Sequence, residues 1–428
     1  MFSISGSIDY RINHTIEFRS LGNASLSLDY VVWTNSEPYQ RVNLASQPDG
    51  LIRTLPDEHK NQISTYVAKL AAGKNNLTFS YDVTVSLSTP NVEARTAGNY
   101  DKSSELYRQY TRSEKFIESD HPKISSIARE VVGSVSDPYN ASFSIFRWVN
   151  RNINYSGPHA ESFGALWALQ NLRGDCTEHA YLFVAMCRSI GIPARCIDGL
   201  SNSSMVRSKD FLWGNIGHDW AEVFFPSYGW IWVDPTWNWF GTNDPVHIAI
   251  QRGNSSELPS FYRFKYNGTG IRYEREIFEV NCLDTKPPDI QNMSVKPSYG
   301  SPGETFQISL EAVDPSGIRR VEVVVQFNNQ LVCILLAKRI RTNTYAVNWT
   351  SSTESKAGNY RVYVTAYDNV ERGMQSSLDV TITQPFPIAP ALLLLILSVA
   401  ALALVYRERK HHDHGCAFSV SHNGTEYV

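Results

Sequence analysis

A cysteine stands at the start of a predicted helix, and this arrangement constrains the fold of the chain more than any other feature. Asp175 and Glu178 have the spacing of a capping box with Asp175 at the N-cap, which makes Cys176 the first helical residue. Apolar residues follow at helical spacing, and Gly191 and Pro193 end the helix. A thiol at this position lies at the positive end of the helix dipole, which favours the thiolate.

The helix end alone does not make this thiol a nucleophile at neutral pH. A free cysteine with a pKa of about 8.5 is only about 3% thiolate at pH 7. Lowering the pKa to about 6 requires about 3.4 kcal/mol, and a helix terminus supplies only about 0.3–2 kcal/mol. We therefore expect a protonated histidine to supply the remainder.

His218 is the predicted histidine, and Asp234 is its predicted carboxylate partner. Residues 218–225 and 230–234 have strand patterns with turn chemistry between them. A loop over residues 224–228 sets His218 directly opposite Asp234, with Cβ atoms about 5 Å apart. A loop one residue shorter places the two side chains on opposite faces, so strand pairing permits the contact without requiring it.

Two other side chains are alternatives at this site. His179 lies one turn along the cysteine helix and is a competing base. Tyr155 is a candidate for binding the oxyanion, or else an ordinary packing residue. The backbone amide of Cys176 is the better oxyanion donor, because amides at a helix N-terminus have no intrahelical partner. Purely structural roles for the cysteine, the histidine and the aspartate are the remaining alternative.

Four ordered motifs resemble the core of the transglutaminase-like superfamily. They lie at residues 174–180, 191–195, 218–223 and 229–236, and the resemblance spans roughly residues 100 to 245. It implies a papain-like α/β core with Cys176 as nucleophile, His218 as base and Asp234 as the group that orients the base. No cofactor or metal is implied. The superfamily includes protein cross-linking enzymes, thiol peptidases, peptide N-glycanases and inactive relatives, and the motifs do not choose among them.

The whole chain is predicted to be an α+β multidomain protein. Its 42% hydrophobic and 12% aromatic content is sufficient for several packed cores. The predicted parts are an N-terminal β-sandwich-like domain (1–95), the transglutaminase-like core (96–283), an immunoglobulin-like β-sandwich (284–386), a transmembrane helix (387–406) and a cytoplasmic tail (407–428).

The predicted immunoglobulin-like domain leaves two questions open. Asp314 and Asp368 lie at predicted turns, where they either bind calcium at a loop cluster or only form the turns. Cys282 and Cys333 are either a disulfide pair or separate thiols, because six cysteines over this length do not define a disulfide framework.

An uncharged stretch near the C-terminus predicts a single membrane span. Residues 388–406 are long enough as a helix, at about 28 Å, to cross the hydrocarbon core. Arg407, Arg409 and Lys410 follow, so the C-terminus is expected in the cytoplasm and the catalytic part outside it. Asn-X-Ser/Thr sequons from Asn13 to Asn348 favour the same orientation. The first residues have no signal-peptide pattern, so we expect either a lost signal or a tail-anchored arrangement.

These patterns predict a membrane-anchored surface thiol enzyme that acts on peptide or protein amide bonds through an acyl-enzyme on Cys176. The acyl group would pass to water or to an amine. The alternative is a catalytically inactive surface binding or adhesion protein with a relic core. The net charge of −3 gives no reason to expect nucleic-acid binding, so the expected partners are a peptide or protein substrate and the membrane.

Overall fold

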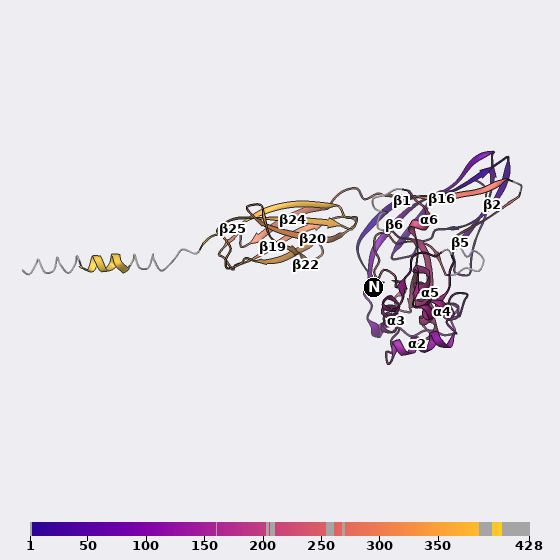
Figure 1. Ribbon diagram of the computed structural model, residues 1–428, viewed down its shortest axis with the longest axis horizontal. Helices are drawn as coiled ribbons and strands as arrows, with labels where there is room; N and C mark the ends of the chain where they lie inside the picture. Colours follow the sequence, from indigo (N-terminus) through magenta and orange to yellow (C-terminus); the bar gives the residue numbers. More distant parts are fainter. Residues whose placement is uncertain are drawn as a thin grey trace, which may run out of the picture. The chain divides into compact units, whose positions relative to one another are not determined.

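The computed structural model describes residues 2–159, 161–202, 205, 210–253, 261–267, 270–384 and 396–404. The chain divides into two compact units. The first unit contains Met1–Ile290 together with Ala312–Val321 and Ala366–Met374, and the second contains Gln291–Glu311, Glu322–Thr365 and Gln375–Val428. The α+β multidomain class predicted from the sequence is confirmed, because several antiparallel sheets accompany a helical core (Figure 1).

Two sheets form the β-rich part of the first unit, in the strand orders β10-β16-β1-β6-β3 and β15-β2-β5-β4. Their bounds are β1 (Phe2–Ser20), β2 (Ala24–Val32), β3 (Gln40–Ser46), β4 (Leu51–Pro56), β5 (Gln62–Leu70), β6 (Gly73–Pro90), β10 (Asp210–Phe211), β15 (Tyr262–Asn267) and β16 (Ile271–Cys282). Side chains alternate between buried and exposed, so that Ile8, Tyr10 and Ile12 enter the core from β1. Tyr30 and Phe79 stack there with ring centroids 3.7 Å apart.

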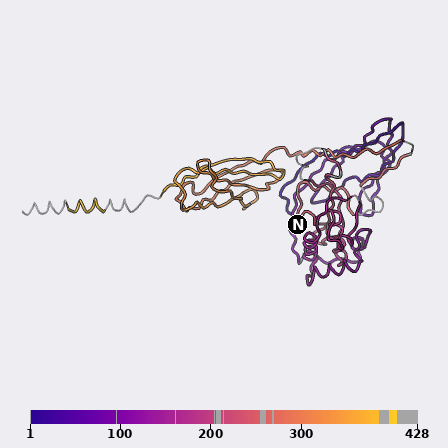
Figure 2. The backbone as a smooth tube through the Cα atoms, in the orientation of Figure 1, coloured from indigo at the N-terminus to yellow at the C-terminus, as the bar shows by residue number. Residues whose placement is uncertain are grey.

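Two strands of these sheets come from far along the chain. β16 pairs antiparallel with β1, from Cys282 opposite Tyr10 to Ile271 opposite Ser20, and β15 pairs with β2. Figure 2 shows this later segment, in orange tones, running beside the indigo N-terminal strands. The N-terminal β structure is therefore completed by strands that follow the helical core. The domain boundaries at residues 95 and 283 stay predictions.

The helical part of the first unit is built around α5. The helices are η1 (Ala94–Thr96), α1 (Glu105–Thr111), α2 (Pro122–Val132), α3 (Pro138–Asn152), α4 (Ala165–Asn171), α5 (Cys176–Ser189) and α6 (Trp213–Ile216). Every residue of α5 from Glu178 to Arg188 is buried, and α2, α3 and α4 contact it (Figure 1). A helix buried on all sides is the centre of a core rather than a surface helix.

A five-stranded sheet covers α5 with the strand order β13-β12-β11-β9-β14. The bounds are β9 (Ala194–Leu200), β11 (Gly217–Phe225), β12 (Gly229–Asp234), β13 (Trp239–Phe240) and β14 (Ile248–Arg252). A short parallel pair, β7 (Asn154–Tyr155) with β8 (Arg173–Gly174), leads into the start of α5. The predicted cysteine helix and the two predicted strands after it are thus present.

Two further sheets form a β-sandwich pattern, in the strand orders β17-β19-β23-β22 and β18-β25-β24-β20-β21. The bounds are β17 (Asp289–Lys296), β18 (Tyr299–Gly300), β19 (Thr305–Val313), β20 (Ile318–Phe327), β21 (Gln330–Leu336), β22 (Lys338–Arg339), β23 (Thr344–Thr350), β24 (Gly358–Asp368) and β25 (Gly373–Ile382). Cys282 and Cys333 are free thiols, so the disulfide alternative is wrong.

The predicted membrane segment lies largely outside the described residues. Residues 396–404 are helical. Within the part of the chain that the structure describes, no helix has the length and apolar character needed to cross a bilayer. The rest of the span predicted at 387–406, and the predicted tail from Arg407 onward, are outside the described residues.

The sheet next to α5 requires glycine at position 199. Gly199 pairs with His218 on one side and with Ala249 on the other. A Cβ atom there would lie 2.3 Å from the Ile248 carbonyl oxygen and 2.5 Å from the Trp220 ring. Only the absence of a side chain allows this close approach.

We therefore expect Gly199→Ala to lower the free energy of unfolding by about 1–3 kcal/mol, the usual cost of overpacking. Urea denaturation followed by tryptophan fluorescence measures the change. Gly22→Ala is the matched control, because a Cβ atom at Gly22 meets nothing within 4 Å. Equal stability of the two variants would contradict the tight packing at Gly199.

Candidate active site

The capping box predicted at the start of α5 is confirmed. Asp175 is the N-cap, and its Oδ1 accepts a hydrogen bond of 2.9 Å from the Thr177 amide. Glu178 Oε2 accepts one of 3.1 Å from the Asp175 amide. The remaining carboxylate oxygens accept from the amides of His159 and Phe163, at 2.8 and 2.9 Å. These bonds fix the helix start, and with it the backbone of Cys176.

Strand β11 is joined to this helix start through Asp219. The Thr177 hydroxyl donates to the Asp219 carboxylate. The backbone amide of Asp219 acts on the thiol of Cys176 as well, since it lowers the pKa of that thiol. The thiol thus lies beside the residue that follows His218. Contact between the sulfur and the His218 ring stays a prediction.

The environment of the thiol differs from the sequence-based expectation. Burial raises the pKa of Cys176, and the charges of Asp219, Asp175 and Asp234 raise it further, against a smaller lowering by the Asp219 amide. The expected lowering of the pKa is therefore wrong for the resting structure. The position of the thiol at a helix start, and hence the effect of the helix dipole, can be recognised in the sequence. Burial of the sulfur and the approach of the carboxylates occur only when the chain folds.

His218 and Asp234 are brought together as predicted, but in another register. The observed pairs run from Ala221 opposite Val233 to Phe225 opposite Gly229, so the predicted direct pairing of His218 with Asp234 is wrong. The loop is shorter because the Tyr228 amide bonds to the Phe225 carbonyl at 2.9 Å and Gly229 adopts a φ of 81°.

The contact survives this change because the shift is an even number of residues. An even shift keeps both side chains on one face of the sheet. Extending the observed register sets Trp220 opposite Asp234, which makes His218 a diagonal neighbour within side-chain reach. His218 Nε2 lies 2.7 Å from Asp234 Oδ2, and both side chains are buried.

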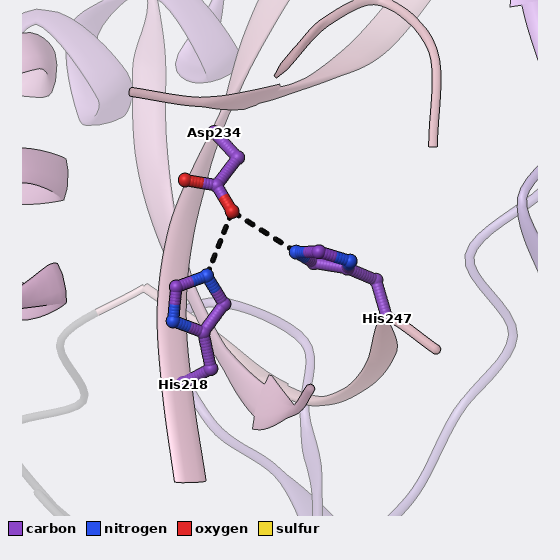
Figure 3. A group of neighbouring side chains, drawn as sticks. All are labelled: His218, Asp234 and His247. Atoms are coloured by element: carbon purple, nitrogen blue, oxygen red, sulfur yellow. Dashed lines mark hydrogen bonds and ion pairs between the residues drawn. The ribbon is translucent and has the colours of Figure 1, made fainter. Parts of the chain in front are cut away.

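Asp234 is also bound by a second histidine, which the sequence analysis missed. His247 Nε2 lies 3.0 Å from Asp234 Oδ2, the same oxygen that contacts His218 (Figure 3). Asp234 Oδ1 accepts from the amides of Thr236 and Trp237 at 2.8 and 3.0 Å. Burial by itself raises the pKa of Asp234, but the charges and hydrogen bonds of the two histidines outweigh burial and hold that pKa well below its usual value.

His247 lies between two aspartates, an arrangement that favours its imidazolium form. Its Nδ1 lies 2.7 Å from Asp244 Oδ1, and that oxygen also accepts from the amides of Val246 and His247 at 2.9 and 3.0 Å. Burial lowers the pKa of His247, but Asp244 and Asp234 together raise it to about 10. The only sequence signal is an Asp-x-x-His spacing at Asp244, which is too common to single out His247.

The imidazole and carboxylate atoms of His218, Asp234 and His247 lie within 4.8 Å of one another, a spacing that is also compatible with a metal ion. The hydrogen-bond distances favour protons instead, because both imidazoles already contact one carboxylate oxygen. A protonated His247 offers no lone pair to a metal. The arrangement is therefore suited to proton transfer at His218.

The two alternatives raised by the sequence have different outcomes. His179 Nδ1 lies 2.6 Å from the Asp175 carbonyl oxygen and its Nε2 lies 3.1 Å from the Ile153 carbonyl oxygen, so backbone contacts occupy both ring nitrogens. This leaves His179 unsuited to act as the base. Tyr155 is 56% exposed, and the charge of Cys176 contributes to raising its pKa, after burial. The role of Tyr155 in binding the oxyanion stays a prediction, with ordinary packing as its alternative.

Aromatic side chains enclose the histidine and aspartate pair. The ring centroids of Trp220 and Trp237 lie 5.9 and 5.4 Å from that of His218. Trp220 is buried, whereas Trp237 is 37% exposed and forms a boundary with solvent. Their apolar surfaces exclude water, which strengthens the interactions among the charged groups inside.

A thiol at a capped helix start, beside a buried histidine and aspartate on an adjoining sheet, defines a candidate thiol acyl-transfer core. Comparison with known proteins agrees with this class. Residues 125–235 match the Transglutaminase-like superfamily, and the chain contains a core of that superfamily.

Similar proteins cover the chain only in part. The uncharacterized protein YebA of Bacillus subtilis is 32% identical over 69 residues, which is 15% of this chain and 9% of YebA. The uncharacterized protein ML0607 of Mycobacterium leprae is 24% identical over 173 residues, which is 38% of this chain and 56% of ML0607. The chain thus spans less than two thirds of either relative.

A crystal structure of a candidate cysteine protease from Cytophaga hutchinsonii aligns with a TM-score of 0.49 and 17% identity. The alignment covers 67% of this chain and 94% of that one.

We expect His247→Gln to destabilise the protein in a pH-dependent way. The folded-state pKa of about 10 lies above the ordinary value of 6.5, so the stabilisation by His247 is fully present below pH 6.5 and is lost as the pH rises toward 10. Breaking such a buried pair costs about 3–5 kcal/mol. Urea unfolding at pH 6, 8 and 10 should show a large loss at pH 6 that shrinks by pH 10.

The control for this substitution is His159→Gln, because His159 is exposed. Its effect should be small at all three pH values. A loss of the same size at every pH for His247→Gln would show that His247 contributes packing only and would contradict the charged state.

Proposed function

We propose that this protein is a thiol enzyme that transfers acyl groups from peptide or protein amides through a thioester on Cys176. The observation that carries the proposal is the convergence of three elements. The start of α5 supplies the thiol, β11 supplies His218 next to Asp219, which accepts a hydrogen bond from Thr177 at that helix start, and the end of β12 supplies Asp234 in hydrogen-bond contact with His218.

The first half-reaction begins with a proton transfer. His218 takes the thiol proton of Cys176, and the sulfur attacks the amide carbonyl to form a tetrahedral oxyanion. The backbone N–H of Cys176 is placed to donate to this oxyanion, because it belongs to the first turn of α5. Collapse breaks the C–N bond, His218 returns its proton to the leaving amine, and a thioester remains.

The second half-reaction reverses these roles. His218 takes a proton from water or from a primary amine, and that oxygen or nitrogen attacks the thioester. Collapse expels the sulfur, which regains its proton. Attack by water gives hydrolysis, and attack by an amine gives transamidation. The same thiol and histidine can therefore serve both reactions.

The raised pKa of Cys176 fits a resting thiol rather than a stable thiolate. Transfer of its proton to His218 creates a thiolate and an imidazolium together, and Asp234 stabilises that imidazolium through the 2.7 Å contact. Asp234 can do this because amides and His247 already hold its carboxylate in place.

We expect Cys176→Ala to abolish amide turnover, and Asp234→Asn to lower kcat by about 10²–10⁴. Peptide libraries with and without a primary amine, read by mass spectrometry, measure hydrolysis and transamidation separately. Cys187→Ala is the matched control, because Cys187 is a fully buried thiol on the same helix and should be dispensable for turnover.

A thiol-reactive peptide electrophile distinguishes the enzyme from an inactive binding protein with the same core. The adduct should form on Cys176 and should be lost in His218→Ala. Faster labelling of Cys282 or Cys333, or labelling of Cys176 that does not depend on His218, would contradict the catalytic proposal.

We also propose that residues 1 to about 386 lie outside the cytoplasm, with the predicted segment 387–406 as the membrane anchor. The uncharged stretch, the basic residues that follow it and the sequons before it support this orientation. A basic cluster at one end of an apolar segment favours the cytoplasmic side for that end.

Protease treatment of intact cells should release a fragment that contains Cys176. A known surface protein serves as the digestion control, and a cytosolic protein as the integrity control. Full protection of the Cys176 fragment, while the surface control is digested, would place the core inside the cell and overturn the proposed topology.

A further inference from the structure

Three aspartates from distant parts of the sequence meet in the first compact unit. Asp284 follows β16, Asp314 follows β19 and Asp368 ends β24. One carboxylate oxygen of each lies within 4.8 Å of the others. Two oxygens that bind one calcium ion at 2.3–2.6 Å can be no more than about 5.2 Å apart, so this spacing is compatible with a shared ion.

Local hydrogen bonds orient two of these carboxylates. Asp314 Oδ1 accepts from the Ser316 amide at 2.8 Å and from the Ser316 hydroxyl. Asp368 Oδ1 accepts from the amides of Val370 and Arg372, at 2.9 and 2.7 Å. A bond of 2.6 Å from the Asn369 side chain to the Ser316 carbonyl joins the two turns. The turns thus hold each Oδ1 and leave each Oδ2 for another partner.

The remaining oxygens include buried atoms with unmet hydrogen-bonding capacity. Asp368 is fully buried, and its Oδ2 has no hydrogen-bond partner among the described residues. Asp284 Oδ2 is likewise buried without a partner in the described part of the chain. A buried carboxylate oxygen without a partner is costly, so each such atom in a folded protein requires an explanation.

The protein itself provides little compensation for this charge. Within the described residues, no lysine or arginine forms an ion pair with Asp284, Asp314 or Asp368. Arg372 lies four residues after Asp368, and its Nη1 is also buried without a partner among the described residues.

We propose that Asp284, Asp314 and Asp368 form a calcium site. The donors are all carboxylates, which are the ligands that hard divalent cations prefer, whereas zinc and copper sites use histidine and cysteine. Three carboxylates, two of them with Oδ1 atoms held by turns, suit the larger and less regular coordination shell of calcium better than the strict octahedron of magnesium. Water would complete the shell.

The bound ion would hold the turns at Asp314 and Asp368 against the end of β16. Existing contacts already bring these segments close, because the Ser7 amide donates to the Pro315 carbonyl at 2.9 Å and the Leu283 amide donates to the Asp9 carbonyl at 2.8 Å. Calcium would therefore stabilise the first unit, whether or not Cys176 is catalytic. The proposal takes up the calcium alternative that the sequence left open for Asp314 and Asp368, and it adds Asp284 to them.

Calorimetric titration of the full chain with CaCl₂, after removal of metal with EDTA, tests the site. We expect saturable binding with a dissociation constant on the order of 10⁻⁴ M, in the range of extracellular calcium modules. Asp284→Asn and Asp368→Asn should each weaken binding at least tenfold, and calcium should raise the Tm of the wild type but not of these variants. MgCl₂ should bind more weakly than CaCl₂.

Asp49→Asn is the matched control, because it makes the same substitution at an exposed aspartate outside the cluster and should bind calcium as the wild type does. If Asp368→Asn does not fold, as judged by circular dichroism, Asp284→Asn alone decides the result. Absence of saturable binding would overturn the proposal and leave Arg372 as the counter-charge. Unchanged affinity in Asp284→Asn, or tighter binding of magnesium, would overturn it as well.

Discussion

The attachment of β11 to the first turn of α5 is the interaction on which the candidate site depends. The Asp219 carboxylate accepts a hydrogen bond from the Thr177 hydroxyl, and the Asp219 amide lowers the pKa of the Cys176 thiol, so a single residue of the strand acts on two consecutive residues of the helix. The helix itself cannot move aside, because its residues from Glu178 to Arg188 are all buried. The strand therefore brings its histidine to a fixed thiol.

Asp234 holds His218, the proposed base, in place on the strand that is attached to the helix start. Its carboxylate is contacted by two amides and two imidazoles, which leaves it no freedom to reorient. His247 keeps a positive charge on the far side of the carboxylate, because Asp244 supports that charge through Nδ1. Such a neighbour helps to hold the pKa of Asp234 well below its usual value, which keeps this carboxylate ionised. The second histidine thus acts through Asp234 rather than on the substrate.

The first unit is held together by segments from most of the chain. Strands that follow the helical core complete the N-terminal sheets, and two turns from the later β-sandwich are grouped with them. This arrangement explains why the three aspartates of the proposed calcium site come from three separate segments.

The sequence by itself determined those features of the fold that are set by residues close together in the chain. The capping box, the limits of the cysteine helix and the existence of the strands around His218 and Asp234 were predictable, because hydrogen bonds between residues a few positions apart set them. The strand register was not, because one turn closed more tightly than expected, and only the period-two alternation of side chains preserved the contact. His247 and Asp284 could not be found, since the folded arrangement of distant segments and not sequence spacing brings them to Asp234 and to the other two aspartates. The pKa of the thiol rises rather than falls for the same reason: the helix dipole is encoded locally, whereas burial and the surrounding carboxylates exist only in the folded structure.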